Sequence, residues 1–465
     1  MLGKSEKLPN AGVSEPIEGK LSNGFHRFWK RLSSGRNELP PLPAWGHAQE
    51  PLLQRARVFF RAEETNASQA LAASKIEEIR RFDVAAMQTA VAICNCGTSG
   101  SVLLASYLDG HDDVIMLPGQ LSTPIYLFFD HYRSLSLHDK LIAYPFVAID
   151  LDDHSKHFFQ GEHRIAAADY HAAVNALFDV YGDRPPEFLE SRRAFFLFLH
   201  IVYCVARGQR PTSPHPLIVY AQHGSNAQLA RYLVADFPQA RFIHTVRDPI
   251  TNCGRLFEHY LISHGFLGPA HVISHLTYAD MPHAKMESRT RAIRFEDLHL
   301  HLEETMGAVA AWLGLPYRSS LLESTFNGVQ WVWRPRTGTT TWSGARPAQA
   351  IRDSRNVSFT DRCLLFAVLY EDFVAWNYPC PRIFKHAFVR VLTSMVVLLI
   401  PMKIEIITVR TLLKSLPSRG FRYTIKGLVR ICLGRLAIVS LLAVELYRRL
   451  AFGKQVLELR TGERE

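Results

Sequence analysis

The stretch that decides the fold is Ala90-Val91-Ala92-Ile93-Cys94-Asn95-Cys96-Gly97-Thr98-Ser99-Gly100-Ser101-Val102-Leu103-Leu104. Its apolar first part predicts a buried strand, and the Gly, Ser and Thr residues that follow predict a turn that opens a helix. The first N–H groups of a helix have no partners within the helix, and the helix dipole places roughly half a positive charge there. The segment therefore predicts an anion site built from backbone groups.

The same loop excludes the commonest nucleotide chemistry. It has no Gly-Lys-Ser/Thr sequence and no lysine at all, so it is not a Walker A loop. A phosphate-bearing ligand fits the pattern, whereas ordinary ATP hydrolysis and nucleotide kinase activity are disfavoured.

Short apolar runs recur along the chain and are separated by helix-length segments. The predicted strands are 90–95, 114–117, 217–221, 241–246 and 291–295. Strands that alternate with helices favour a parallel sheet covered on both faces, which is a three-layer α/β fold. Between the second and third strands, residues 124–210 are rich in Phe, Tyr and His and are predicted to be helical, notably over 166–181 and 187–207. An insertion of this kind commonly determines acceptor specificity.

The net charge of +10 comes from one end of the chain. Residues 380–465 contain 16 Lys or Arg and 5 Asp or Glu, so residues 1–379 are nearly neutral. This distribution argues against nucleic acid as a partner. The seven cysteines are scattered without a Cys-x-x-Cys pair, and Met1–Lys20 does not look like a signal peptide, so we expect an intracellular protein and no metal site.

The basic C-terminal region contains two apolar segments, 387–402 and 428–447, that are interrupted by charged residues. Neither provides about 20 uninterrupted apolar residues, so neither predicts a clean membrane-spanning helix. Apolar segments joined by a basic stretch are typical of amphipathic helices at an anionic membrane surface. Two alternatives stay open: helices packed against the core or a partner chain, and a re-entrant or spanning hairpin.

A second anion site is predicted at Arg247, in the segment Ala240-Arg241-Phe242-Ile243-His244-Thr245-Val246-Arg247-Asp248-Pro249. An arginine at the carboxyl end of a parallel strand points into the crevice where open α/β sheets bind ligands. Its planar guanidinium can hold a phosphate with two hydrogen bonds. The alternative is an arginine that only pairs with a neighbouring carboxylate.

Together these motifs resemble the PAPS-dependent sulfotransferase family. The family opens with a strand, a Ser-Gly-Thr-Thr-type loop and Leu-Leu, and this chain has 97–104 in that place. The family's second motif ends in Val-Arg-Asp-Pro, as does 237–249, and its third, Arg-(Tyr/Phe)-Glu-Asp-Leu followed by Leu-Gly-Leu-Pro, matches 294–298 and 313–316. The resemblance covers residues 90–316 and extends to about Tyr378.

The resemblance implies that the donor is 3'-phosphoadenosine 5'-phosphosulfate (PAPS), which leaves as PAP. The 5' side would lie on the first loop, formed by Gly97, Thr98, Ser99, Gly100, Ser101 and Val102. Arg247 would hold the 3'-phosphate. The implied reaction is in-line sulfuryl transfer, which resembles phosphoryl transfer physically and requires no metal in this family.

The chain departs from the family pattern at two positions. Thr98 stands where the family has a loop Lys or Arg, and one lost preorganised donor typically costs about 3–4 kcal/mol of transition-state stabilisation. Arg255 stands where the family has a serine, eight residues after Arg247, and can face the same 3'-phosphate. Arg334 and Arg336 lie in a late loop that the family folds over the nucleotide, and Arg336 in particular is a candidate replacement for the missing cation.

The reaction also needs a base for the acceptor proton, which is a His or Glu in the family. His223, directly after a predicted strand, is the first candidate, and His111 is the second. Glu296 and Asp297 look like an acid/base pair, but in the family this position supports the fold.

We therefore expect a mostly disordered arm over residues 1–50, a helical lead-in over 51–86, a P-loop-like sulfotransferase domain over 87–379 and a basic amphipathic helical extension over 380–465. The expected activity is sulfuryl transfer from PAPS to a hydroxyl or amine of a carbohydrate or lipid-linked acceptor, at the cytoplasmic face of a membrane. The alternative is a catalytically impaired nucleotide-binding or scaffold protein at a membrane.

Overall fold

The computed structural model describes residues 49–63, 66–95, 98–117, 125–149, 165–222, 227–264, 287–333, 342–344 and 357–452. The chain divides into two units, residues 1–42 and 43–465, and every described residue belongs to the second. The predicted disordered arm, residues 1–50, lies outside the described residues except for its last two.

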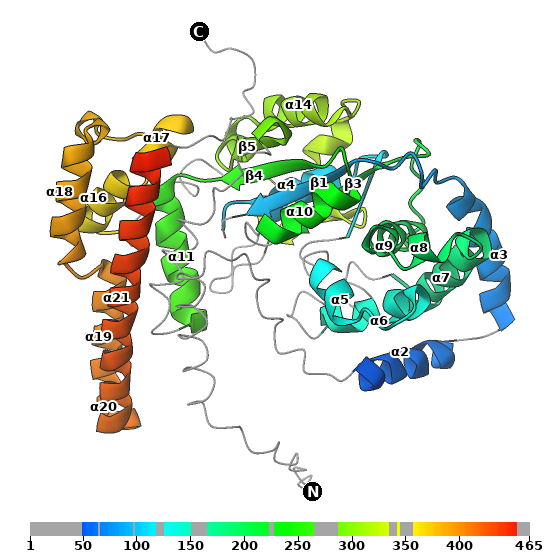
Figure 1. Ribbon diagram of the computed structural model, residues 1–465, viewed down its shortest axis with the longest axis horizontal. Coiled ribbons are helices and arrows are strands. Elements are labelled where there is room, and N and C mark those ends of the chain that lie inside the picture. Colours follow the sequence, from blue (N-terminus) through cyan, green and yellow to red (C-terminus); the bar gives the residue numbers. More distant parts are fainter. Residues whose placement is uncertain are drawn as a thin grey trace, which may run out of the picture. The chain divides into compact units, whose positions relative to one another are not determined.

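The centre of the fold is a parallel sheet of five strands (Figure 1). The strands are β1 (Ala90–Asn95), β2 (Val114–Met116), β3 (Leu217–Gln222), β4 (Arg241–Val246) and β5 (Thr290–Arg294). Every strand lies within one residue of its predicted bounds, because short apolar runs that end in turn residues leave little choice of register. Helices flank the sheet, and the predicted three-layer α/β class is confirmed.

The strand order is β2-β3-β1-β4-β5, which places β1 in the middle. The chain moves from β1 to one side of the sheet and returns past β1 to form β4, so the direction of winding changes between β1 and β4. Ligands of open α/β sheets bind outside the carboxyl ends of the strands at such a switch point. Asn95 pairs in register with Thr245, so the loops that follow β1 and β4 begin at the same level.

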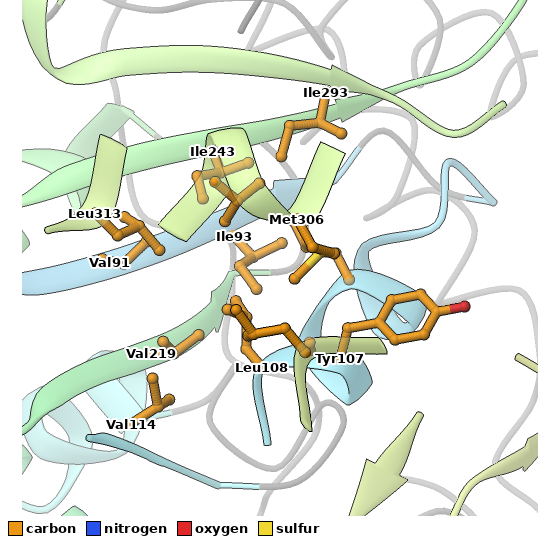
Figure 2. Packing of buried hydrophobic residues seen from close by; sticks show 14 of the residues in the cluster. Val91, Ile93, Tyr107, Leu108, Val114, Val219, Ile243, Ile293, Met306 and Leu313 are labelled. Carbon is orange, nitrogen blue, oxygen red and sulfur yellow. The ribbon is translucent and has the colours of Figure 1, made fainter. Parts of the chain in front are cut away.

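One face of the sheet is covered by α4 (Ser101–Leu108) and α14 (Leu302–Leu313). Figure 2 shows strand residues such as Val91, Ile93 and Ile243 in one cluster with Met306 of α14 and with Leu108 of α4. These side chains are fully buried, and alternate residues of each strand share this face. The cluster fixes the start of α4 directly after β1.

Aromatic side chains of the insertion form the core on the other face. The helices involved are α5 (Ile125–His131), α6 (Leu137–Ile149), α7 (Ala167–Tyr181), α8 (Pro186–Leu189) and α9 (Arg192–Ala206). The ring of Phe196 lies 5.3 Å from that of Tyr126 and 5.4 Å from that of Tyr220 on β3, and all three side chains are fully buried. These three aromatic side chains therefore pack in the interior of the fold.

The remaining helices frame this centre. The lead-in consists of α2 (Gln49–Glu63) and α3 (Asn66–Arg80), and the later helices are α10 (Ala227–Asp236), α11 (Pro249–His264), α13 (Asp297–Leu300), α16 (Phe359–Val368) and α17 (Tyr370–Ala375). Two short antiparallel pairs are β6 (Thr325–Phe326) with β7 (Val329–Gln330) and β8 (Val332–Trp333) with β9 (Trp342–Ser343). Helix α11 begins at Pro249, so it starts immediately after Arg247 and Asp248.

The C-terminal extension is helical, as predicted. It contains α18 (Ala387–Leu398), α19 (Lys403–Lys414), α20 (Leu416–Arg419) and α21 (Phe421–Phe452), with α19 and α21 side by side in Figure 1. The spanning alternative that the sequence left open concerns α21, which includes the apolar segment 428–447. Within Phe421–Val444 an 18-residue window has a mean hydropathy of 2.0, and this part of α21 is long and apolar enough to cross a membrane, by length and composition only.

Candidate functional site

The loop between β1 and α4 has an unusual backbone. Thr98 has a φ of 49° and Gly100 a φ of 95°, so two nearly adjacent residues adopt the left-handed conformation. Gly100 is the N-cap of α4 and provides no capping side chain. Left-handed turns at the start of a helix direct N–H groups toward one point, which is the geometry of a backbone anion site.

Glycine is required at position 100 by the close approach of Phe295 as well as by the positive φ. A Cβ atom at this position would lie 2.4 Å from Cδ2 of Phe295. Phe295 follows β5 and belongs to the Arg-Phe-Glu-Asp-Leu motif, so the first and third motifs are in direct contact. Only glycine permits this approach.

Arg247, in the second motif, contacts Thr98 of the first motif and Phe295 of the third. Its Nη1 donates a hydrogen bond of 3.1 Å to the carbonyl oxygen of Thr98. Its guanidinium carbon lies 4.2 Å from the centre of the Phe295 ring, and only 7% of the residue is exposed. The positive charge is thus held beside the loop that starts α4.

Two buried polar residues, Asn252 and Thr245, form hydrogen bonds with the loop, and the sequence reasoning did not single them out. Asn252 on α11 accepts a 2.6 Å hydrogen bond from Oγ1 of Thr98, and the hydroxyl of Thr245 on β4 lies 2.8 Å from that of Ser99. Ser99 is 1% exposed, so its hydroxyl supports the loop. The position of Asn252, one turn into the helix after Arg-Asp-Pro, is the signal that was available in the sequence.

Glu296 has a supporting role. One of its carboxylate oxygens accepts the backbone N–H of Asp248, at 3.1 Å, and the other accepts the hydroxyl of Tyr378, at 2.7 Å. Burial, together with the negative Glu296, raises the pKa of Tyr378 well above its ordinary value. Asp297 lies 3.6 Å from Arg294 instead. These contacts fit the expected support of the fold and not an acid/base pair.

The second candidate base, His111, is excluded by its surroundings. The residue is fully buried, its Nδ1 accepts the backbone N–H of Asp113, and its Nε2 lies 2.8 Å from the carbonyl oxygen of Pro316. Since Nδ1 is an acceptor, Nε2 carries the proton and donates it to that carbonyl. Neither nitrogen can take a proton from an acceptor.

The other predicted site residues divide into two groups. Arg255 lies on α11, half-buried and three residues beyond Asn252, and Ser101 and Val102 begin α4. Gly97, His223, Arg334 and Arg336 lie outside the described residues, so their roles stay predictions. Cys94 is a packing residue, because it is buried and burial raises its pKa to about 12.

The arrangement is suited to binding an anion. The positive end of α4 and the Arg247 guanidinium lie at the same edge of the sheet, and both favour negative charge. Asp248, the acid next to Arg247, is already engaged, because it accepts the N–H of Thr251 at 2.7 Å. In the described part of the chain, no three His, Cys, Asp or Glu side chains are grouped so as to hold a metal ion.

The comparisons with known proteins agree with this arrangement. A model of the sulfotransferase family matches residues 90–319, which include all three motifs. No curated protein matches the sequence significantly.

Among solved structures, the chain is similar to three sulfotransferases. The sulfotransferase domain of the Synechococcus olefin synthase is 18% identical, with 51% of this chain and 76% of that one covered and a TM-score of 0.28. The sulfotransferase domain of the curacin biosynthetic pathway is 17% identical, with 51% of this chain and 76% of that one covered and a TM-score of 0.26. A sulfotransferase from Mycobacterium avium is 14% identical, with 58% of this chain and 71% of that one covered and a TM-score of 0.30. The topology of the sheet is given by its strand pairing.

Three motifs far apart in the sequence therefore meet at the switch point of one parallel sheet, and the family model spans all three of them. On these grounds residues 90–319 of the chain lie in a domain of the sulfotransferase family.

Proposed function

We propose that this protein transfers a sulfuryl group from PAPS to a hydroxyl or amine of a carbohydrate or lipid-linked acceptor. Family membership supports sulfuryl transfer in general. The donor and the acceptor class are the specific parts of the proposal. They rest on the site and, for a lipid-linked acceptor, on the character of the C-terminal helices.

The observation that carries the donor assignment is the hydrogen bond from Arg247 to the carbonyl oxygen of Thr98. It holds the arginine and the N-terminus of α4 at one edge of the sheet, so the site has two positive centres. PAPS carries a phosphosulfate at its 5' side and a phosphate at its 3' side, which are separate anionic groups. A loop built from backbone N–H groups suits the first, and a guanidinium suits the second.

In the proposed reaction, an acceptor oxygen or nitrogen forms a bond to the sulfur while the bond from sulfur to the 5'-phosphate oxygen breaks. PAP leaves with the electron pair of that bond, and the acceptor's proton passes to a base, for which His223 is the predicted residue. Charge spreads over the sulfuryl oxygens as the bonds exchange. Preorganised donors that face these oxygens lower the barrier.

A second candidate function is supported by Thr98. This residue stands where the family has a cation, and its hydroxyl donates to Asn252. A hydroxyl that is already engaged cannot replace a Lys or Arg that would neutralise the leaving oxygen. The alternative is therefore a protein that binds the nucleotide but transfers sulfate slowly or not at all.

Binding of PAP, the product nucleotide, tests the donor assignment. We expect isothermal titration calorimetry of the full chain to give saturable binding, and Arg247→Ala to weaken it about 10–100-fold, since a charged hydrogen bond is worth about 1.5–3 kcal/mol. Arg80→Ala is the control, because Arg80 lies on α3 and pairs with Glu77 at 2.6 Å, in a different part of the fold from the loop. Arg247→Lys and the unfolding temperature of each variant without ligand separate lost binding from lost folding. ATP binding more tightly than PAP would contradict the assignment.

Turnover distinguishes the two functions. Labelled PAPS incubated with lipid and carbohydrate acceptors should give labelled product if the wild-type chain is an active transferase. If PAP binds, no acceptor is labelled, and Thr98→Arg produces transfer, the impaired form is correct.

A further inference from the structure

Large apolar side chains that face solvent are concentrated in the C-terminal helices. In the described part of the chain, 23 such side chains are exposed, and 17 of them lie between Ile383 and Leu450. Soluble proteins scatter exposed apolar residues singly, and a larger continuous patch marks an interaction surface. The C-terminal helices therefore present a surface that is suited to an apolar environment.

Helix α18 has the reverse polarity of an ordinary surface helix. Its exposed side consists of apolar residues at helical spacing, namely Phe388 at 76%, Leu392 at 50%, Met395 at 65% and Leu399, just after the helix, at 86% exposure. Its buried side includes Arg390 and Ser394, at 6% and 3%. Arg390 donates to the carboxylate of Glu371 and lies 5.2 Å from the centre of the Tyr370 ring. The charge is paired inside, while Phe388, Leu392, Met395 and Leu399 are left outside.

Helix α21 also has an exposed apolar stripe. Its exposed apolar residues lie three, four or eight positions apart, namely Phe421, Ile425, Val429, Leu433, Leu436, Val444 and Tyr447. At 1.5 Å per residue this stripe is about 39 Å long. The other side of α21 packs on neighbouring helices, and its Arg435 reaches Glu405 of α19 at 2.9 Å. One face of α21 thus packs on the protein, and the opposite face is exposed and suited to an apolar medium.

The charge around the stripe identifies what covers it. Between residues 406 and 444 there are seven Lys or Arg and no Asp or Glu. Exposed basic residues gather where α19, α20 and α21 meet, namely Arg410, Lys414, Arg419, Arg422 and Lys426. A second copy of this chain would bring the same positive charge and be repelled, whereas anionic lipid headgroups attract it.

We propose that α18 and α21 dock this protein in the plane of an anionic lipid bilayer. The exposed faces of both helices enter the boundary between headgroups and acyl chains, and the basic residues between 410 and 426 contact the headgroups. Although α21 is long enough to span, one of its faces is held by α19 and by the Arg435–Glu405 pair, which favours an in-plane position. This docking is independent of the proposed transfer activity.

Vesicle flotation of the full chain tests the proposal without any nucleotide. We expect the protein to float with vesicles of 70% phosphatidylcholine and 30% phosphatidylserine, and less with phosphatidylcholine alone or at high salt. The double variant Phe388→Ser with Leu399→Ser should bind the anionic vesicles about 100-fold less, because two large apolar side chains no longer enter the lipid. Its unfolding midpoint should not change, since both side chains are exposed. Val58→Ser, a change at a 56% exposed residue of α2, is the matched control and should float like wild type.

Several outcomes would overturn the proposal. One is a full chain that does not float, and another is a double variant that floats like wild type. If light scattering finds a dimer without lipid and the double variant is monomeric, the surface binds a second copy. If alkaline carbonate fails to extract the protein from cell membranes, α21 spans the bilayer and does not lie in its plane.

Discussion

The sheet domain and the C-terminal helices use apolar and charged residues in opposite ways. In the sheet domain, β1, α4 and α14 enclose a fully apolar cluster, while Arg247 lies at the edge where the strands end. In the C-terminal helices, Arg390 is buried beside Glu371, while Leu399 is 86% exposed. The first pattern is that of a protein folded in water. The second indicates that part of this chain is built for a medium other than water.

The first prediction contrasts one leucine from each region. Leu108→Ala should lower the free energy of unfolding by about 2–5 kcal/mol, because Leu108 is fully buried and its removal leaves a cavity. Leu399→Ala should change it by less than about 0.5 kcal/mol. Urea denaturation of both variants measures the difference. Equal losses would mean that Leu399 is covered in solution and that the contrast between the regions is wrong.

The second prediction concerns the loop itself. Gly100→Ala should destabilise the protein by about 1–2 kcal/mol for its left-handed backbone and by about 1–3 kcal/mol more for the overlap with Phe295. Gly208→Ala is the matched control, because Gly208 has a φ of 73° and nothing within 4 Å of an added Cβ. Denaturation of the two variants isolates the contact with Phe295. Equal effects would show that Phe295 does not pack on the loop.

The third prediction concerns the pH dependence of stability. In the described ion pairs the buried His200 has no carboxylate partner, whereas the buried Arg390 of the C-terminal helices is paired with Glu371. His200 on α9 is 1% exposed, its Nδ1 lies 2.7 Å from the carbonyl oxygen of Phe196, and burial lowers its pKa from 6.5 to about 4. The folded state therefore binds a proton less readily than the unfolded state, and stability falls as the pH drops from 6.5 toward 4. Between pH 7 and pH 5 this group accounts for about 2 kcal/mol.

The variant His200→Gln should remove that part of the pH dependence. Denaturation at pH 7 and pH 5 measures it, and His386→Gln, at an exposed histidine of the C-terminal helices, is the control. If the free energy of unfolding of His200→Gln changes between pH 7 and pH 5 as much as that of wild type, the histidine is not buried in its neutral form.

The strands and the anchor points of the site could be predicted from the sequence because each has a local signal. The apolar run before Cys96 and the one before Arg247 mark β1 and β4, and the parallel topology then brings their ends together. The predicted fold class rested on these two runs and the three other apolar runs, and the five-stranded parallel sheet confirms it. Arg247 could be placed at the sheet edge because it directly follows a strand.

Contacts between distant segments had no such signal. The sequence does not reveal that Phe295 packs on Gly100, or that Asn252 accepts the hydroxyl of Thr98, because these pairs are 195 and 154 residues apart. His111 is an example of the opposite error: a histidine beside a motif looks reactive until both nitrogens are found to be engaged. The reversed polarity of α18 also depends on which of its faces packs on the protein, and only the folded chain determines this.

The central claim is that the loop from Thr98 to Val102 and Arg247 form one site for PAPS. The most direct test is the dissociation constant of PAP for the wild-type chain and for Arg247→Ala, measured on protein shown to be folded. The account predicts saturable binding by wild type and a loss of about 10–100-fold in the variant. Equal affinity in the two proteins, or no binding by wild type at millimolar PAP, would contradict it.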